Sequence, residues 1–258
     1  MRNTQLGSMW AETGDSRGHG WKSGTAVLRQ LGVAVIAVHS WGQPAYLSSP
    51  QELLETDPRA FARWLETNRP EPVAAHDKAR ILASLSSEGQ VTNLDAASLR
   101  KLATLNPLLR AIGRETAFEI RVIDAPLARI GLYERTLVLI SKTALTLLEA
   151  EELQAQVAHE SGHEYVRVDE DSASARKDGR RLKDLELLCD AIAIATLQGL
   201  EVDPSRLMAG IEKITRHNLK AFGTAVDDRN YPTLSERREF ARAVTAWMAR
   251  KGSPRSSR

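Results

Sequence analysis

Residues 157–163 read Val-Ala-His-Glu-Ser-Gly-His, and they lie inside a predicted helix over about 151–167. Four residues advance a helix by about 400°, so His159 and His163 project from the same face, roughly 6 Å apart along the axis. Two imidazole nitrogens in this arrangement can occupy two corners of a zinc tetrahedron. Glu160 lies too far round the helix to be a close ligand, but it can reach a water molecule held on the metal, where a general base is needed. The alternative is a pair of surface histidines on a charged helix.

The stretch Glu186-Leu-Leu-Cys-Asp190 offers a third ligand. Its two acidic residues are four positions apart in a predicted helix over 181–199, so they share one face. They stand in the otherwise apolar run 185–200, and buried carboxylates are costly unless they are paired or bound to a metal. We therefore expect Glu186 to bind the zinc. Asp190 is expected to accept a hydrogen bond from a zinc-binding histidine, with His159 as the favoured donor. The alternative is an exposed polar stripe on an amphipathic helix.

The rest of the chain predicts a mostly helical α+β fold with a small sheet beside the motif helix. Apolar and polar residues alternate in two stretches, 117–123 and 133–141, which predicts two strands joined by a turn-rich connection over 124–131. A polar loop over 169–179 is expected to turn the chain back, so that the helix of Glu186 lies antiparallel to the motif helix. Further helices are expected at about 49–66, 73–85, 143–149, 204–221 and 234–250. Another helix is expected to begin after Asn93 or Asp95 and to be bent or split at Pro107. Its expected core residues are Leu99, Leu102, Leu105 and Leu109.

The overall composition excludes several classes of protein. The chain has 258 residues, of which 42% are apolar and 26% charged, as in a globular protein. Lys and Arg total 35 and Asp and Glu total 33, so there is no basic excess that would indicate nucleic-acid binding. The single cysteine, Cys189, excludes an internal disulfide and is interpreted as a packed core residue. No stretch has the roughly 18–20 apolar residues of an integral membrane span.

The pattern His-Glu-x-Gly-His at 159–163, followed by Glu-x-x-x-Asp-x-x-Ala at 186–193, resembles that of the gluzincin metallopeptidases. More narrowly, it is similar to the family of the CAAX prenyl protease and the heat-shock protease HtpX, which includes soluble minimal members. The resemblance covers about 115–240, and it extends weakly to 231–237, which is similar to the family's His-Pro…Arg segment. The family's membrane helices are missing, so cleavage of prenylated proteins within a membrane is not implied.

The residues and the resemblance together predict a zinc-dependent endopeptidase with a zincin-like core, acting on a peptide or protein substrate. One zinc ion per chain, with water as the fourth ligand, is expected to be held by His159, His163 and Glu186. Glu160 would take a proton from that water and give it to the leaving amine, while Asp190 orients His159. Tyr231 stands where the family has a histidine, and we expect it to donate a hydrogen bond to the developing oxyanion, with Arg237 as the competing donor.

The predicted strand over 133–141 has an expected role in substrate binding. It directly precedes the motif helix, and the family resemblance implies an edge strand beside the zinc site. An extended substrate peptide would add to such an edge through backbone hydrogen bonds. We therefore expect this strand to be the edge strand that borders the zinc cleft.

The chain is expected to consist of four parts: a signal-like or disordered segment over 1–48, a helical segment over 49–112, the metallopeptidase domain over 113–250 and a disordered tail over 251–258. The first part contains basic residues, the apolar run 31–38 and then small and polar residues, as secretory signals do. These features favour export to the periplasm or the medium over a cytoplasmic location.

Two other functions stay open at this level. The chain could be an inactive relative that is stabilised by zinc and binds peptides or partner proteins, although a purely structural site does not need Glu160. It could also be an enzyme held latent by residues 49–112, in which His76 is the residue able to block a zinc ion. His217 could approach the metal site, but a solvent-facing position on its helix is favoured.

Overall fold

The computed structural model describes residues 48–85, 87, 89–223 and 230–250. The predicted signal-like segment lies outside these residues except for Ser48, and the predicted tail over 251–258 lies outside them entirely. Export therefore stays a prediction from the sequence. Within the described residues the chain is mostly helical with one three-stranded sheet, which confirms the expected α+β class.

The described part of the chain begins with α2 (Pro50–Glu55), α3 (Pro58–Thr67) and α4 (Ala75–Ser84). The expected single helix over 49–66 is wrong, because the chain breaks at Asp57. Pro58 has no N–H group and disfavours a helical conformation for the residue before it. Asp57 is accordingly extended, and its carboxylate accepts a hydrogen bond from the Arg59 N–H at 3.0 Å, so it caps the second helix.

The next helices, α5 (Ala96–Ala103) and α6 (Leu105–Ala111), are split as Pro107 predicted, with the break at Thr104. Pro107 therefore lies in the first turn of α6, where its missing N–H costs no helical hydrogen bond. Leu105 and Leu109 are buried as expected, whereas Leu99 is 54% exposed and is not a core residue. The break interrupts the apolar stripe that a single continuous helix would have had.

The sheet consists of β1 (Glu119–Ile123), β2 (Ile130–Tyr133) and β3 (Leu137–Ser141) in the order β1-β3-β2. Strand β1 pairs with β3 in parallel, and β2 pairs with β3 antiparallel. The expected single strand over 133–141 is confirmed only over 137–141, which form β3, because Glu134 and Arg135 make a tight turn with φ angles of 46° and 56°. Strand β2 covers the end of the predicted connection and extends to Tyr133, the first residue of the expected strand. Strand β3 is thus central, and β1 and β2 lie at the two edges of the sheet.

Among the residues that the structure describes, five helices follow the sheet: α7 (Lys142–Leu147), α8 (Ala150–Arg176), α9 (Gly179–Gly199), α10 (Ser205–Phe222) and α11 (Leu234–Met248). The predicted polar loop over 169–179 is wrong, because α8 continues through most of it. This stretch is polar, but it has neither Gly nor Pro before Lys177. Lys177 ends α8 in the left-handed conformation, and the Asp178 carboxylate caps α9. The two helices are therefore joined by a very short turn.

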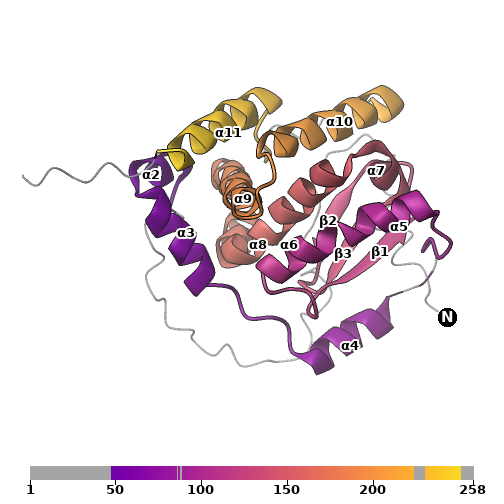
Figure 1. Cartoon of the computed structure of the whole chain (residues 1–258). Helices are drawn as coiled ribbons and strands as arrows, with labels where there is room; N and C mark the ends of the chain where they lie inside the picture. Colours follow the sequence, from indigo (N-terminus) through magenta and orange to yellow (C-terminus); the bar gives the residue numbers. More distant parts are fainter. Residues whose placement is uncertain (1–47, 86, 88, 224–229, 251–258) are drawn as a thin grey trace, which may run out of the picture.

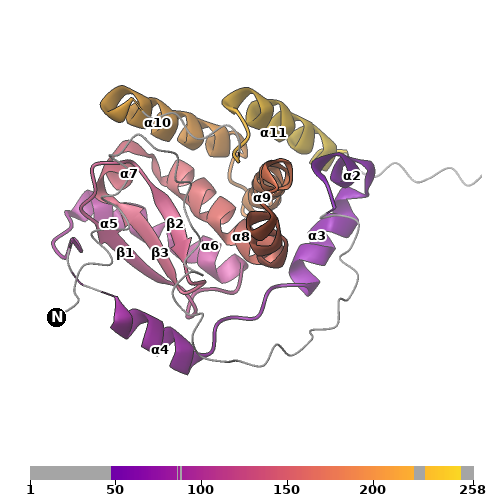
Figure 2. The ribbon, with the colours of Figure 1, turned by 180° about the vertical axis from the view of Figure 1, so that it is seen from behind.

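The long helix α8 lies between the sheet on one side and α9 on the other, as both views show (Figures 1 and 2). The first helices, α2 and α3, lie beside α11 (Figure 1). One hydrophobic core includes Leu53 and Phe61 from these first helices as well as Val244 and Trp247 from α11. Among the described residues, the structure contains no helix with both the length and the apolar character needed to span a bilayer.

Candidate metal centre

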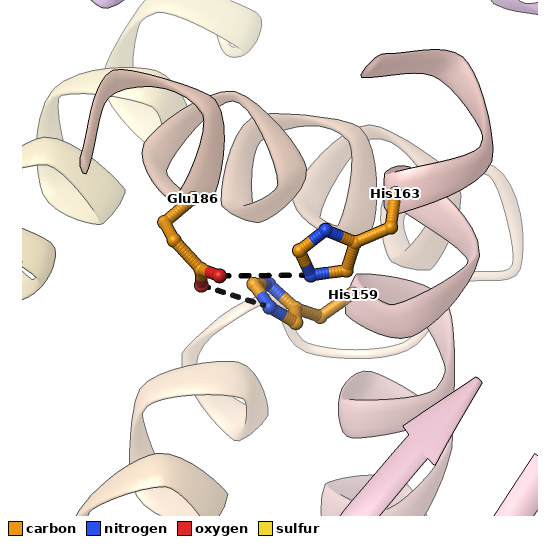
Figure 3. A group of neighbouring side chains, drawn as sticks. All are labelled: His159, His163 and Glu186. Atoms are coloured by element: carbon orange, nitrogen blue, oxygen red, sulfur yellow. Dashed lines mark ion pairs between the residues drawn. The ribbon is translucent and has the colours of Figure 1, made fainter. Parts of the chain in front are cut away.

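Three side chains from two helices meet where α8 and α9 pack together. His159 and His163 come from α8 and Glu186 comes from α9, and their rings and carboxylate face one another (Figure 3). The distance from His159 Nε2 to Glu186 Oε2 is 3.4 Å, and that from His163 Nε2 to Glu186 Oε1 is 3.8 Å. One potential ligand atom of each residue lies within 4.8 Å of those of the other two, so the group could hold a metal ion.

The Glu186 carboxylate is well suited to bind a cation. Burial alone would raise the pKa of Glu186, but the hydrogen bond with His159 and the charges of His163 and Arg237 lower it to about 2. The group is therefore ionised at neutral pH. A carboxylate oxygen and two imidazole nitrogens are among the ligands that zinc takes in proteins.

The second ring nitrogen of His159 is held by Asp190. The distance from His159 Nδ1 to Asp190 Oδ1 is 2.9 Å, as the sequence predicted for this pair. Asp190 is fully buried, and it also accepts hydrogen bonds from Arg237 Nε at 2.8 Å and Arg237 Nη2 at 2.5 Å. Burial would raise the pKa of Asp190, but the charge of Arg237 and the contact with His159 hold it below its ordinary value. Arg237 thus keeps Asp190 ionised and fixes the orientation of its carboxylate.

Glu160 lies next to the three ligands and is oriented by the edge strand. Its Oε2 atom accepts a hydrogen bond of 3.2 Å from the backbone N–H of Leu132 in β2. Burial raises the pKa of the Glu160 carboxyl, while the charges of His163 and His159 act in the opposite direction. A carboxylate whose basicity is raised in this way is suited to accept a proton near neutral pH. The role of Leu132 was not predicted, because its strand was not.

Tyr231 lies close enough to the group to interact with it electrostatically. Burial and the negative charge of Glu186 raise the pKa of the Tyr231 phenol to about 12, against the effects of His163 and Arg129. The phenol therefore stays protonated and able to donate a hydrogen bond. Arg129, immediately before β2, interacts with both Tyr231 and Glu160, and burial lowers the pKa of its guanidinium. Arg129 was not predicted as a site residue, because it falls in the predicted connection over 124–131.

The other residues considered from the sequence either lie outside the candidate metal centre or have an unreactive side chain. His217 on α10 lines a shallow cavity beside α7, together with Lys142, Thr143, Thr146 and Leu147. The side chain of His76 is 82% exposed, and its Nε2 is 3.1 Å from Asp77 Oδ2. Cys189 is buried, and this burial raises the pKa of its thiol to about 12, so it is a packed thiol and not a nucleophile.

Neither of two comparisons with known proteins identifies a relative of this chain. A scan of the chain against protein-family models gives no match, and a search of curated proteins gives none either.

Proposed function

We propose that the chain is a zinc-dependent endopeptidase of the gluzincin type, with a zincin-like core similar to that of the CAAX prenyl protease and HtpX family. The observation that carries the proposal is the meeting of His159, His163 and Glu186, with the Glu160 carboxylate beside them. A metal site used only for stability needs ligands but no neighbouring base. The partly buried Glu160, whose carboxylate is held by the Leu132 N–H, therefore favours catalysis over a structural role.

The residues present fit a catalytic zinc ion. Two imidazoles and one carboxylate are a ligand set of catalytic zinc sites, which keep one position open for water or substrate. Both histidines turn Nε2 toward Glu186, which leaves Nδ1 of each ring free to bond a carboxylate. When bound, zinc polarises a substrate carbonyl and makes water more acidic.

Glu160 is the proposed general base. It would accept a proton from the attacking water and pass it to the amine that leaves when the peptide bond breaks. The Leu132 N–H holds one oxygen of Glu160, so the carboxylate cannot turn freely. Tyr231 is the proposed donor to the negative charge that develops on the substrate carbonyl, because its phenol stays protonated at neutral pH.

Strand β2 is the proposed binding edge for the substrate, in place of the strand expected from the sequence. The Leu132 N–H points away from β3 and toward Glu160, whereas the Arg129 carbonyl accepts a hydrogen bond from Ser141 on the β3 side. Since backbone groups alternate along a strand, those of Ile130 point in the same direction as those of Leu132. An extended peptide could pair with this edge and place its scissile bond beside Glu160.

The proposal is tested by hydrolysis of a mixed peptide library, with cleavage products identified by mass spectrometry. The purified protein should contain one zinc per chain and cleave peptides internally. Removal of the metal with 1,10-phenanthroline should abolish cleavage, and added zinc should restore it. A protein that binds zinc and peptides without cleaving any of them would instead be the inactive binding relative.

A further inference from the structure

The His163 ring lies between two carboxylates on opposite sides. Its Nε2 atom is 3.8 Å from Glu186 Oε1, and its Nδ1 atom is 3.3 Å from Glu170 Oε2. His159 has the same arrangement, with Nε2 toward Glu186 and Nδ1 toward Asp190. Each histidine of the candidate metal centre therefore has a carboxylate of its own behind the ring.

Glu170 reaches His163 because α8 continues well beyond the motif at 159–163, as far as Arg176. Seven residues advance a helix by about 700°, nearly two full turns, so positions 163 and 170 share one face. This end of α8 is held to α9 by the ion pair between Asp169 and Arg181, at 2.6 Å. The helix is thus anchored directly beside Glu170, which keeps the carboxylate within reach of the ring.

We propose that Glu170 is a positioning residue for His163: it accepts a hydrogen bond from the Nδ1–H group and so keeps Nε2 directed at the metal. The proposal rests on the metal centre of the proposed function. A histidine that binds a metal through Nε2 carries its proton on Nδ1, and a carboxylate partner fixes both this tautomer and the ring orientation. Glu170 would act through His163 and would touch neither substrate nor metal.

The two supporting carboxylates, Asp190 and Glu170, differ in how far they are exposed to solvent. This difference determines how much the loss of each should weaken metal binding. Asp190 is fully buried and bonded to Arg237, whereas the Glu170 side chain is 35% exposed. Water competes for an exposed carboxylate, and an exposed side chain has more freedom to rotate. Loss of Glu170 should therefore weaken metal binding less than loss of Asp190.

The test is the zinc dissociation constant, measured by competition with a chromophoric chelator, for the full chain and three variants. Glu170→Ala should weaken zinc binding by roughly tenfold, at the low end of the range for such supporting residues. Glu170→Gln should lie between wild type and Glu170→Ala, because an amide oxygen still accepts the hydrogen bond. The control is Asp171→Ala, which removes the neighbouring carboxylate, 3.8 Å from Arg167. It should bind zinc within about twofold of wild type.

Measurements of zinc binding and of peptide cleavage together separate the possible outcomes. Equal zinc affinity in wild type and Glu170→Ala would overturn the role of Glu170, even if the wild type cleaves peptides. Equal weakening by Asp171→Ala would also overturn it, since the effect would then belong to the helix as a whole. Weaker binding by Glu170→Ala alone would support the role even if the wild type binds zinc without cleaving peptides. A wild-type chain without zinc affinity would overturn both proposals.

Discussion

Gly162 on α8 packs directly against the backbone of Cys189 on α9. A Cβ atom at position 162 would lie 3.0 Å from Cys189 Cα and 3.2 Å from its carbonyl oxygen. These atoms belong to the main chain, so they cannot move aside without moving the helix. The glycine therefore sets the spacing between the helix of the two histidines and the helix of Glu186.

Gly162→Ala should push α8 and α9 apart and weaken both stability and metal binding. Overpacking of this kind costs roughly 1–3 kcal/mol, and it would also increase the distance between His163 and Glu186. Urea unfolding and zinc titration would measure the two effects. Gly199→Ala is the matched control, because a Cβ atom there meets nothing within 4 Å. Equal behaviour of the two variants would contradict the role given to Gly162.

Arg237→Ala should be strongly destabilising, because it leaves Asp190 as a buried carboxylate without its cation. Breaking a buried ion pair costs about 3–5 kcal/mol. The neighbouring Arg238, whose side chain is 47% exposed and pairs with Glu212 at 2.6 Å, provides the control. Arg238→Ala should cost less than about 1 kcal/mol. Denaturant midpoints that are similar for both variants would show that Arg237 does not hold Asp190.

Tyr231→Phe keeps the ring and removes the proposed hydrogen-bond donor. It should lower kcat by roughly 100- to 1000-fold while zinc content and stability stay near those of wild type. Because the pKa of Tyr231 is raised from 10.0 to about 12, the phenol keeps its proton as the pH passes 10. Loss of this proton should therefore cause no fall in kcat near pH 10. An unchanged kcat in the variant would remove Tyr231 from catalysis.

Helical spacing explains why the centre of the site was predictable. His159 and His163 share a face because they are four residues apart, and Glu186 and Asp190 repeat the same spacing on the next helix. This local geometry needs no knowledge of the tertiary structure. The apolar surroundings of Glu186 then indicated that its carboxylate is buried and needs a partner.

The predictions that were wrong concern features that depend on turns and long-range contacts. The turn that separates β2 from β3 uses Glu134 and Arg135 with positive φ angles, where Gly or Asn would have signalled a hairpin. Without that turn the edge strand could not be assigned, and the Leu132 contact with Glu160 could not be predicted. The polar residues after 168 carry no apolar periodicity, so the extension of α8 that brings Glu170 to His163 was also missed.

The central claim, that this chain hydrolyses peptides with Glu160 as the general base, is tested most directly by Glu160→Gln. The amide keeps the size of the side chain but cannot accept the proton, and the three metal ligands are unchanged. Peptide cleavage and zinc content would be measured on the same preparations of wild type and variant. We predict one zinc per chain in both proteins, with cleavage reduced by at least about 100-fold in the variant. Equal cleavage by the two proteins, or a wild type that holds zinc and cleaves nothing, would contradict the claim.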